Sequence, residues 1–341
     1  MERLEKLYEG RSPFHGEMHD HSASGGTSDG KRPLSHWLGA MEALKLDFAA
    51  ILDHRQVRHM FEPEWEDGVF IGGTEPAVLI SDSTAEKAWM HYLMIFEGPE
   101  PVMELLSHFP EYGYTGGVEG HFDYPAFTRE HFCELIDYVK EQGGFFVHPH
   151  PKQCMISDEP LDYWFRDGTG IEVFYGHYET KWTEENYALW CELLRLGKRV
   201  WACAGGDWHA CASDGAITTF YATEKKNSAY LEPLRRGDFV CGGVGIRMAI
   251  GNTLMGGSCS FEGEKLLIGI SDFHKSVRHS EHTYRADVIT DRGVVYSTPI
   301  TCTEPAFICL DTEDCAFYRV EIFDTLRDKR IAIGNPIWND R

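Results

Sequence analysis

Short apolar runs alternate with helix-like segments over residues 14–209, and this alternation constrains the fold more than any other feature. Helices with apolar residues at helical spacing are expected at residues 35–45, 128–144 and 183–197, with Thr128 and Thr183 as N-caps of the last two. The apolar runs, which we interpret as strands, occupy residues 14–21, 48–53, 69–75, 91–96, 145–150, 170–176 and 199–209. Strands that alternate with helices of this size predict βα units, and therefore a parallel sheet or barrel.

The pattern changes after about residue 240, where short strand-like runs follow one another without a helical segment. We therefore expect an α/β domain over residues 1–243 and a small all-β domain, sandwich-like, over residues 244–341. Residues 231–243 should join the two domains as a short helix followed by a strand. Residues 97–127 are rich in Gly, Pro and aromatic residues, and we expect them to form a lid or insertion over one end of the first domain.

Side chains that can bind metals gather at the ends of the expected strands. The carboxyl ends of the strands in a βα barrel are where active sites are built. Residues i and i+2 of a strand face the same side, so a His-x-His or Asp-x-His pair can converge on one ion. Each motif alone also occurs in polar turns, but an ordered series of such strand ends favours a metal site. The residues in question are His19, His21, Asp53, His54, Glu75, His91, His148, His150, Asp207 and His209.

Composition limits the partners. The chain carries 32 basic and 54 acidic residues, a net charge of -22, and such a surface repels phosphate backbones, so we expect no nucleic-acid partner. No apolar run approaches the ~18 residues of a membrane span, and the first residues lack an apolar signal region, so we expect a cytoplasmic protein without a membrane partner. The ten cysteines include no Cys-x-x-Cys pair, which argues against a thiolate zinc site.

The order of the motifs resembles the PHP (polymerase and histidinol phosphatase) superfamily. The matching motifs, over residues 14–215, are HDH at 19–21, SDG at 28–30, DH at 53–54, GGTE at 72–75, His91, HPH at 148–150 and GGDWH at 205–209. The resemblance implies a distorted seven-stranded βα barrel with two or three divalent ions, Zn, Mn or Fe. The β-rich tail looks like that of the PHP subgroup related to the carbaryl hydrolase CehA.

The resemblance also implies a set of metal ligands, carried over position by position. They are His19, His21, Glu75 and Asp207 for a first ion, Glu75, His91 and His148 for a second, and Asp29, His54 and His209 for a third. The loop before Asp29 is about three residues longer than the family spacing, so the role of Asp29 stays open. His150 is an extra histidine, and a base, a phosphate contact and a turn residue are all compatible with it.

Three functions are compatible with this site. The first is a metal-dependent phosphoesterase that hydrolyses a small phosphorylated substrate with a metal-activated hydroxide. The second applies the same metals to a carboxylic ester, amide or carbamate, with aromatic residues of the insertion shaping a pocket. The third is a non-catalytic, metal-stabilised binding module. The sequence favours the first and leaves the substrate, the metal and the oligomeric state open, a homo-oligomer included. The catalytic residues expected are Glu75, Asp207 and His150, with Arg55 and Lys152 as cationic helpers.

Overall fold

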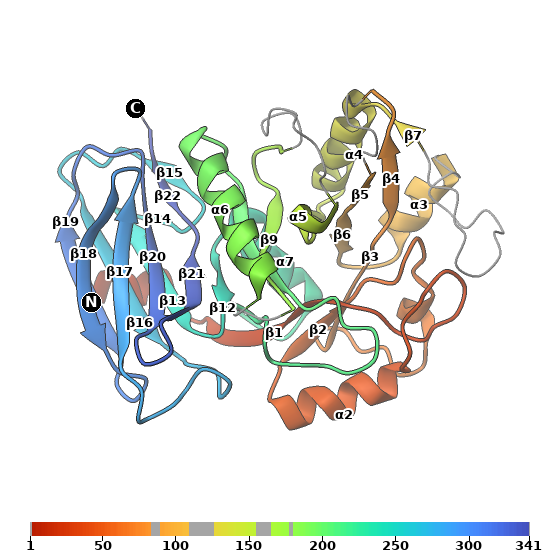
Figure 1. Ribbon diagram of the computed structural model, residues 1–341, viewed down its shortest axis with the longest axis horizontal. Coiled ribbons are helices and arrows are strands. Elements are labelled where there is room, and N and C mark those ends of the chain that lie inside the picture. The colour runs from red at the N-terminus through yellow and green to blue at the C-terminus, as the bar shows by residue number, and fades with distance from the viewer. Residues whose placement is uncertain (1, 83–88, 109–125, 155–164, 177–179, 341) are drawn as a thin grey trace.

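The computed structural model describes residues 2–82, 89–108, 126–154, 165–176 and 180–340. Seven strands form one half of a 15-stranded sheet, in the spatial order β10-β9-β8-β6-β3-β2-β1 (Figure 1). They are β1 (Ser12–Asp20), β2 (Phe48–Ile51), β3 (Phe70–Thr74), β6 (Leu93–Phe96), β8 (Phe145–His148), β9 (Gly170–Tyr175) and β10 (Trp201–Gly205). The expected mixed α/β architecture is therefore present.

One strand departs from the expected parallel arrangement. β6 runs antiparallel to both of its neighbours, β3 and β8, whereas the other pairs in this half of the sheet are parallel. The reason is that two strands precede β6, β4 (Ala77–Ile80) and β5 (Trp89–His91), which pair antiparallel with each other, so the chain runs in opposite directions along them. With β7 (Ala126–Phe127), these two strands form a separate three-stranded sheet. The expectation of an all-parallel sheet is wrong at β6.

The two ends of this half-sheet approach each other beyond β10. The backbone N–H of Asp207 donates to the carbonyl of His19 (2.7 Å), and that of His21 donates to the carbonyl of Trp208 (2.9 Å). An isolated parallel bridge joins Asp20 to Trp208. The segment after β10 therefore lies against the end of β1, although the two strands are six places apart in the order of the sheet. Closure of the sheet into a PHP barrel stays a prediction.

The helices pack against the strands with their apolar faces, which are buried. The helices are α1 (Glu2–Leu7), α2 (Leu34–Leu44), α3 (Glu100–His108), α4 (Arg129–Glu141), α5 (Pro151–Cys154), α6 (Lys181–Arg195) and α7 (Asn227–Arg236), with a 3-10 turn, η1 (Arg58–Phe61). Thr128 caps α4 as expected, since its side chain accepts the N–H of His131. Thr180, not Thr183, caps α6, because it accepts the N–H of Thr183, which lies inside the first turn. Every helix among the described residues is too short or too polar to cross a membrane.

The sheet continues on the other side of β1 as an antiparallel series, in the order β11-β12-β21-β20-β17-β18. These strands are β11 (Thr218–Ala222), β12 (Phe239–Gly242), β21 (Lys329–Gly334), β20 (Phe317–Asp324), β17 (Tyr284–Thr290) and β18 (Gly293–Ile300). A second sheet, in the order β14-β13-β16-β19, lies beside it (Figure 1). Its strands are β14 (Thr253–Leu254), β13 (Gly245–Ile250), β16 (Lys265–Ser271) and β19 (Ala306–Asp311).

Two further short strands, β15 (Ser258–Cys259) and β22 (Ile337–Asn339), pair with each other, and β22 also pairs with β20. The described residues from 244 to 340 form strands and no helix, as expected. The helix α7 and strand β12 occupy the expected joining segment. Because β12 pairs with β21 across residue 243, the sheet is continuous there, and a division into two domains at that residue stays a prediction. Of the expected lid, residues 109–125 lie outside the described residues.

Candidate metal centre

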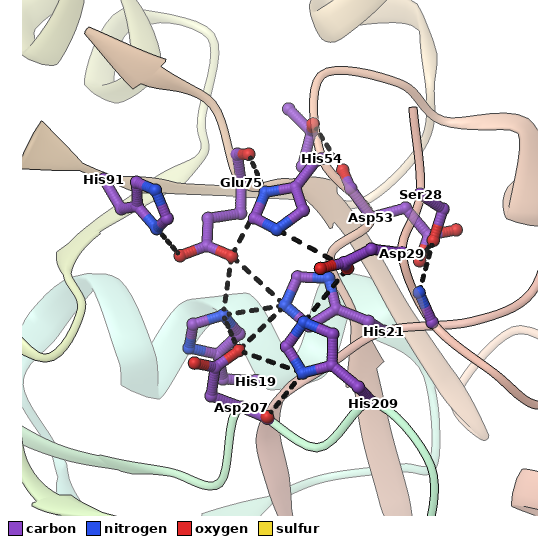
Figure 2. A network of polar contacts seen from close by, with 12 residues as sticks. His19, His21, Ser28, Asp29, Asp53, His54, Glu75, His91, Asp207 and His209 are labelled. Carbon is purple, nitrogen blue, oxygen red and sulfur yellow. Dashed lines mark hydrogen bonds and ion pairs between the residues drawn. The ribbon is translucent and has the colours of Figure 1, made fainter. Parts of the chain in front are cut away.

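Metal-capable side chains meet at one edge of the first half-sheet, where β1, β2, β3 and β10 end (Figure 2). His91 reaches the same edge from the end of β5, just before β6 begins. Since β6 is antiparallel to β3 and β8, its start lies beside their carboxyl ends. The antiparallel strand therefore explains how a histidine that precedes a strand joins residues that follow strands.

The first cluster consists of His19, His21, Glu75 and Asp207. Glu75 Oε2 lies 3.1 Å from the Nε2 atoms of both histidines. Asp207 Oδ1 lies 3.1 Å from His21 Nε2 and 3.6 Å from His19 Nε2, and the two Nε2 atoms are 3.3 Å apart. Four donors bound tetrahedrally at 2.0–2.2 Å from one ion stand about 3.3–3.6 Å apart. The donor atoms thus have the spacing that a four-coordinate divalent ion requires.

Glu75 connects this cluster to a second one. Its other oxygen, Oε1, lies 2.8 Å from His91 Nδ1 and 3.1 Å from His150 Nε2. These three residues also have donor atoms close enough to share an ion. One buried carboxylate therefore presents one oxygen to each of two neighbouring clusters, as a carboxylate that bridges two metals does.

The third cluster contains Asp29, His54 and His209, together with His21. Asp29 Oδ1 lies 3.0 Å from His209 Nε2 and 3.6 Å from His54 Nε2. The long loop before Asp29 therefore does bring this carboxylate back to the two histidines. Asp29 is half exposed, whereas the first cluster is buried, so the third cluster lies nearest the solvent.

Asp53, the first residue of the DH motif, fixes that loop instead of facing an ion. Its Oδ1 accepts the backbone N–H of Ser22 (2.6 Å) and the hydroxyl of Ser28 (3.0 Å). Its Oδ2 accepts the hydroxyls of Ser22 (2.7 Å) and Ser24 (2.5 Å), and lies 3.0 Å from His59 Nδ1. Although Asp53 is buried, these donors hold its pKa well below its usual range. A serine-rich loop wrapped on one buried carboxylate sets the position of Asp29.

Hydrogen bonds at Nδ1 orient the histidine rings. His54 Nδ1 lies 2.9 Å from the carbonyl of Glu75, and His209 Nδ1 lies 2.9 Å from the carbonyl of Asp207. His19 Nδ1 lies 2.8 Å from Glu172 Oε1. Because carbonyls and carboxylates accept the Nδ1 proton, the Nε2 atoms are left as acceptors that face the clusters.

Glu172 and Tyr175, both on β9, contact residues of these clusters and were not expected from the sequence. The second oxygen of Glu172 accepts the backbone N–H of His150 (2.8 Å), and the hydroxyl of Tyr175 donates to Asp207 Oδ2 (2.8 Å). Gly205 lies against Glu172 and His19, where a side chain would collide with both. The available signal was an acidic residue in the otherwise apolar run of residues 170–175.

Charge in the centre is carried by buried acids and histidines. Burial raises the pKa of Glu75, but His19, His91 and His54 outweigh it and hold that pKa well below the usual range. Burial also raises the pKa of Asp20, which stands between His19 and His21 at the end of β1, to about 8. All donors in the three clusters are nitrogen or carboxylate oxygen, a set that suits Zn, Mn and Fe. The residues present therefore fit divalent metal ions.

His148 is in none of these clusters of described residues, so its expected role as a ligand stays a prediction. Its ring lies among Phe132, Phe146 and Phe165, at centroid distances of 6.1, 5.1 and 4.5 Å. Burial lowers its pKa to about 3, so this ring is neutral. His150 takes the place beside Glu75, because the chain turns at Pro149 and leaves the strand.

The two expected cationic helpers lie outside the three clusters. Arg55 is buried and donates from Nη2 to the carbonyl of Ala77 (3.3 Å). Lys152 is exposed at the second position of α5. Three residues in or next to the clusters, Arg55, His150 and Asp207, have positive φ, of 54°, 30° and 54°. Each such residue costs on the order of 1–3 kcal/mol and persists where the surrounding structure enforces it.

No protein-family model matches this chain, and no curated protein is significantly similar to it. Among solved structures, the chain is similar to PsfC from Pseudomonas syringae PB-5123, at 12% identity and a TM-score of 0.39, over 61% of this chain and 82% of that one. It is also similar to the lesion-specific endonuclease PfuEndoQ from Pyrococcus furiosus, at 13% identity and a TM-score of 0.46, over 66% and 56% of the two chains.

A third similar structure is Endonuclease Q in complex with a 27-mer duplex substrate that has an abasic lesion at the active site. Its identity is 13%, its TM-score is 0.46, and the match covers 66% of this chain and 57% of that one. The chain thus spans little more than half the length of these endonucleases. This finding corrects the exclusion of nucleic acid, which rested on net charge. Net charge is a sum over the whole chain, whereas phosphate binding is decided locally, by nearby basic residues and bound cations.

Proposed function

We propose that this chain is a metal-dependent phosphoesterase of the PHP type. The observation that carries the proposal is the placement of Glu75, whose two oxygens face different clusters. Pairs of ion sites joined in this way serve the in-line displacement at phosphorus in phosphatases and nucleases. The order of motifs along the chain supports the same family. The CehA subgroup and a cytoplasmic location remain predictions.

The proposed ligand sets follow the three clusters. They are His19, His21, Glu75 and Asp207 for one ion, Glu75, His91 and His150 for a second, and Asp29, His54 and His209 for a third. When bound, divalent ions at these positions supply polarisation of phosphoryl oxygens and a nucleophile at neutral pH. The number of ions, two or three, and the choice among Zn, Mn and Fe are part of the proposal that experiment decides.

The chain's own groups prepare these positions. Glu172 and the carbonyls of Glu75 and Asp207 hold the Nδ1 protons of three histidines, so their Nε2 lone pairs point inward. Tyr175 donates to one oxygen of Asp207 and leaves the other for the first cluster. Its pKa is raised, mainly by burial and by Asp207, so the hydroxyl keeps its proton. This fixed geometry removes the need to reorganise donors during the reaction.

Phosphate esters are the proposed substrate class, because divalent ions with open positions match the charge of phosphoryl oxygens. Small monoesters and diesters, including the diesters of a nucleic-acid strand, belong to this class. Arg55 is buried against a carbonyl and Lys152 is exposed on a short helix. We therefore assign neither a direct contact with the reacting phosphate.

The test is hydrolysis by protein that has been stripped of metal and reloaded with Mn²⁺, Zn²⁺ or Fe²⁺. The substrates are nucleotides, sugar phosphates, a chromogenic phosphodiester and a duplex with an abasic site. We expect turnover with at least one metal, its loss in chelator, and its loss in Glu75→Gln. Glu64→Gln changes an exposed glutamate outside the clusters and should retain the activity.

The outcomes separate the alternatives. Metal-loaded protein that releases no phosphate and cleaves no diester would refute the proposal. Hydrolysis of an aryl ester or carbamate in that same sample would select the second hypothesis. Bound metal without any turnover, unchanged in Glu75→Gln, would favour a binding module.

A further inference from the structure

A fourth group of metal-capable side chains lies away from this centre, in the loop of residues 272–283 between β16 and β17. His279, Glu281 and His282 each offer one ligand atom, and the three atoms lie within 4.8 Å of one another. The proposed phosphoesterase centre uses none of these residues. The loop belongs to the C-terminal strands, whereas the centre is built on the ends of the first strands.

The geometry of the group suits a single ion. The two imidazole rings have centroids 4.6 Å apart, and His282 Nε2 lies 3.9 Å from Glu281 Oε1. Two donors at 2.0–2.2 Å from one ion stand about 2.9–4.2 Å apart, depending on the angle between them. The Glu281 side chain is 70% exposed and can adjust its position without disturbing packing.

A buried carboxylate orients the second histidine. His282 Nδ1 lies 2.5 Å from Asp324 Oδ2, and the His282 side chain is only 8% exposed. The other oxygen of Asp324 accepts the backbone N–H groups of Leu326 and Arg327 (3.1 and 3.3 Å). Both oxygens of Asp324 are therefore engaged, so this residue holds the ring instead of binding an ion. When a carboxylate accepts the Nδ1 proton, the lone pair of Nε2 is left to bind a metal, which is the usual arrangement of a metal-bound histidine.

The first histidine carries an unsatisfied atom. His279 Nε2 is buried and has no hydrogen-bond partner among the described residues. A buried polar atom without a partner costs on the order of 1–3 kcal/mol, and coordination to an ion would remove that cost.

The backbone around these side chains is held in place. The N–H of His279 donates to the hydroxyl of Tyr284 (2.9 Å), and Cys302 Sγ donates to the carbonyl of His279 (3.5 Å). At the other end of the loop, His274 Nε2 lies 3.0 and 3.2 Å from the carbonyls of Leu44 and Lys45, where α2 ends. The loop therefore spans from the C-terminal strands to a helix of the first half of the molecule.

We propose that His279, Glu281 and His282 form a separate divalent-metal site that secures this loop, with Asp324 as its positioning residue. Two imidazoles and one carboxylate favour Zn²⁺ and neighbouring ions of similar character. Three protein ligands leave a position for water, and the metal would join His279 to His282 within the loop and, through Asp324, hold the loop at the end of β20.

The test counts zinc and does not depend on activity. Full-length protein is stripped with chelator and dialysed against a fixed concentration of free Zn²⁺, and bound zinc is measured by elemental analysis. We expect His279→Ala to bind one equivalent less than the wild-type protein. His36→Ala, which removes an exposed histidine on α2, should bind as much as the wild type.

Two further variants keep the test decisive. Glu281→Ala changes an exposed side chain and should still fold, but the zinc affinity of this site should fall at least about tenfold. Asp324→Asn should weaken the same site about 10–100-fold, as loss of an orienting partner does. Equal zinc binding by wild type, His279→Ala and Glu281→Ala would overturn the proposal. These variants should keep the hydrolytic activity of the wild type. Failure of the separate metal site would therefore appear in the zinc count, and failure of the proposed phosphoesterase function would appear in the hydrolysis assay.

Discussion

Buried charge is handled in opposite ways in two regions of this molecule. In the C-terminal half, Glu321 on β20 is paired by protein groups alone. Arg330 Nε lies 2.8 Å from Glu321 Oε2, Arg319 contacts Oε1, and the hydroxyl of Tyr187 on α6 donates to that same Oε1 (2.6 Å). In the metal centre, Glu75 and Asp207 face histidines, which are cationic only when protonated.

The difference separates structural from functional use of buried charge. At Glu321, arginines of the chain itself balance the buried carboxylate, so no bound ion is needed. Arg330 contacts both Glu321 on β20 and Glu184 on α6, and these contacts join α6 to the sheet beside it (Figure 1). Where histidines surround several carboxylates, with donor atoms spaced for an ion, a bound cation can replace the histidine protons as the counter-charge.

Removal of the paired charge should have the largest effect on stability. Glu321→Gln leaves Arg319 and Arg330 buried without a full counter-charge, which costs about 3–5 kcal/mol. We expect the loss of unfolding free energy in urea to be the same with metal and with chelator. Glu313→Gln, at an exposed site, is the control. A loss that appears only in the metal-loaded protein would contradict the contrast.

Metal removal should have the next largest effect, mainly through the centre. Ions present at 100 times their dissociation constant stabilise the folded state by about 2.7 kcal/mol per site. Chelation should therefore lower the midpoint of thermal unfolding of the wild type. In Glu75→Gln most of this metal-dependent shift should be missing. An equal shift in both proteins would show that the stabilising ions lie elsewhere.

Asp53→Asn tests the loop that carries Asp29. An asparagine cannot accept all the hydrogen bonds that Asp53 accepts from the serine-rich loop, so the loop loses its fixed position. The metal affinity of the third cluster should then fall about 10–100-fold. The measurement is the number of metal equivalents bound at a fixed free concentration. Asp137→Asn changes a half-exposed aspartate on α4 as the control. Uniform weakening at all clusters would indicate a general loss of structure.

The pH dependence of stability should have a component from His15 on β1, whose Nδ1 lies 2.8 Å from Thr219 Oγ1 on the neighbouring strand β11. Burial, followed by His274, lowers the pKa of His15 to about 4. The unfolded chain binds this proton near pH 6.5, so between pH 6.5 and 4 the unfolded state holds more protons. Stability should therefore fall as pH falls through this range, by at most about 1.4 kcal/mol per pH unit from this group. His15→Gln should reduce that slope in urea titrations, and an unchanged slope would assign it to other groups.

The smallest effect is expected for His148→Phe. The ring packs among phenylalanines, and its two nitrogens have no hydrogen-bond partner among the described residues, so a phenylalanine should fill the same volume with a change in unfolding free energy of less than about 1.5 kcal/mol. Metal content should stay the same, whereas His150→Phe should lose metal at the second cluster. Elemental analysis of the two variants decides between the two histidines.

The predictable features of the fold were local ones. The strand and helix positions before residue 240 and the series of strands after it follow from apolar spacing, which neighbouring residues set. The edge at which Glu75, Asp207 and the His19–His21 pair meet followed from their places at strand ends. The direction of β6 did not follow, because the antiparallel strands β4 and β5 reverse the chain before it, and apolar runs carry no information about direction.

The features of the site that the sequence did not indicate come from contacts between distant residues. The sequence offers His148 and His150 as equal candidates for the position beside Glu75. The structure distinguishes them, because His148 packs against Phe132 and Phe165 whereas His150 lies beside Glu75. Glu172 and Asp53 gained their roles from His19, His150 and the serine loop. Such partners lie up to 153 residues away, and no local pattern identifies them.

By itself, the sequence determined which chemical groups are available and at which strand ends they stand. It established a site of imidazole and carboxylate donors, since residue type and a two-residue period suffice for that. Only the tertiary structure decided how these groups combine. It placed the two oxygens of Glu75 in different clusters, folded Asp29 back to His54 and His209, and buried His148 in an apolar core. The physical reason is that coordination requires donor atoms within a few Å of one another, and that proximity arises from packing between segments far apart along the chain.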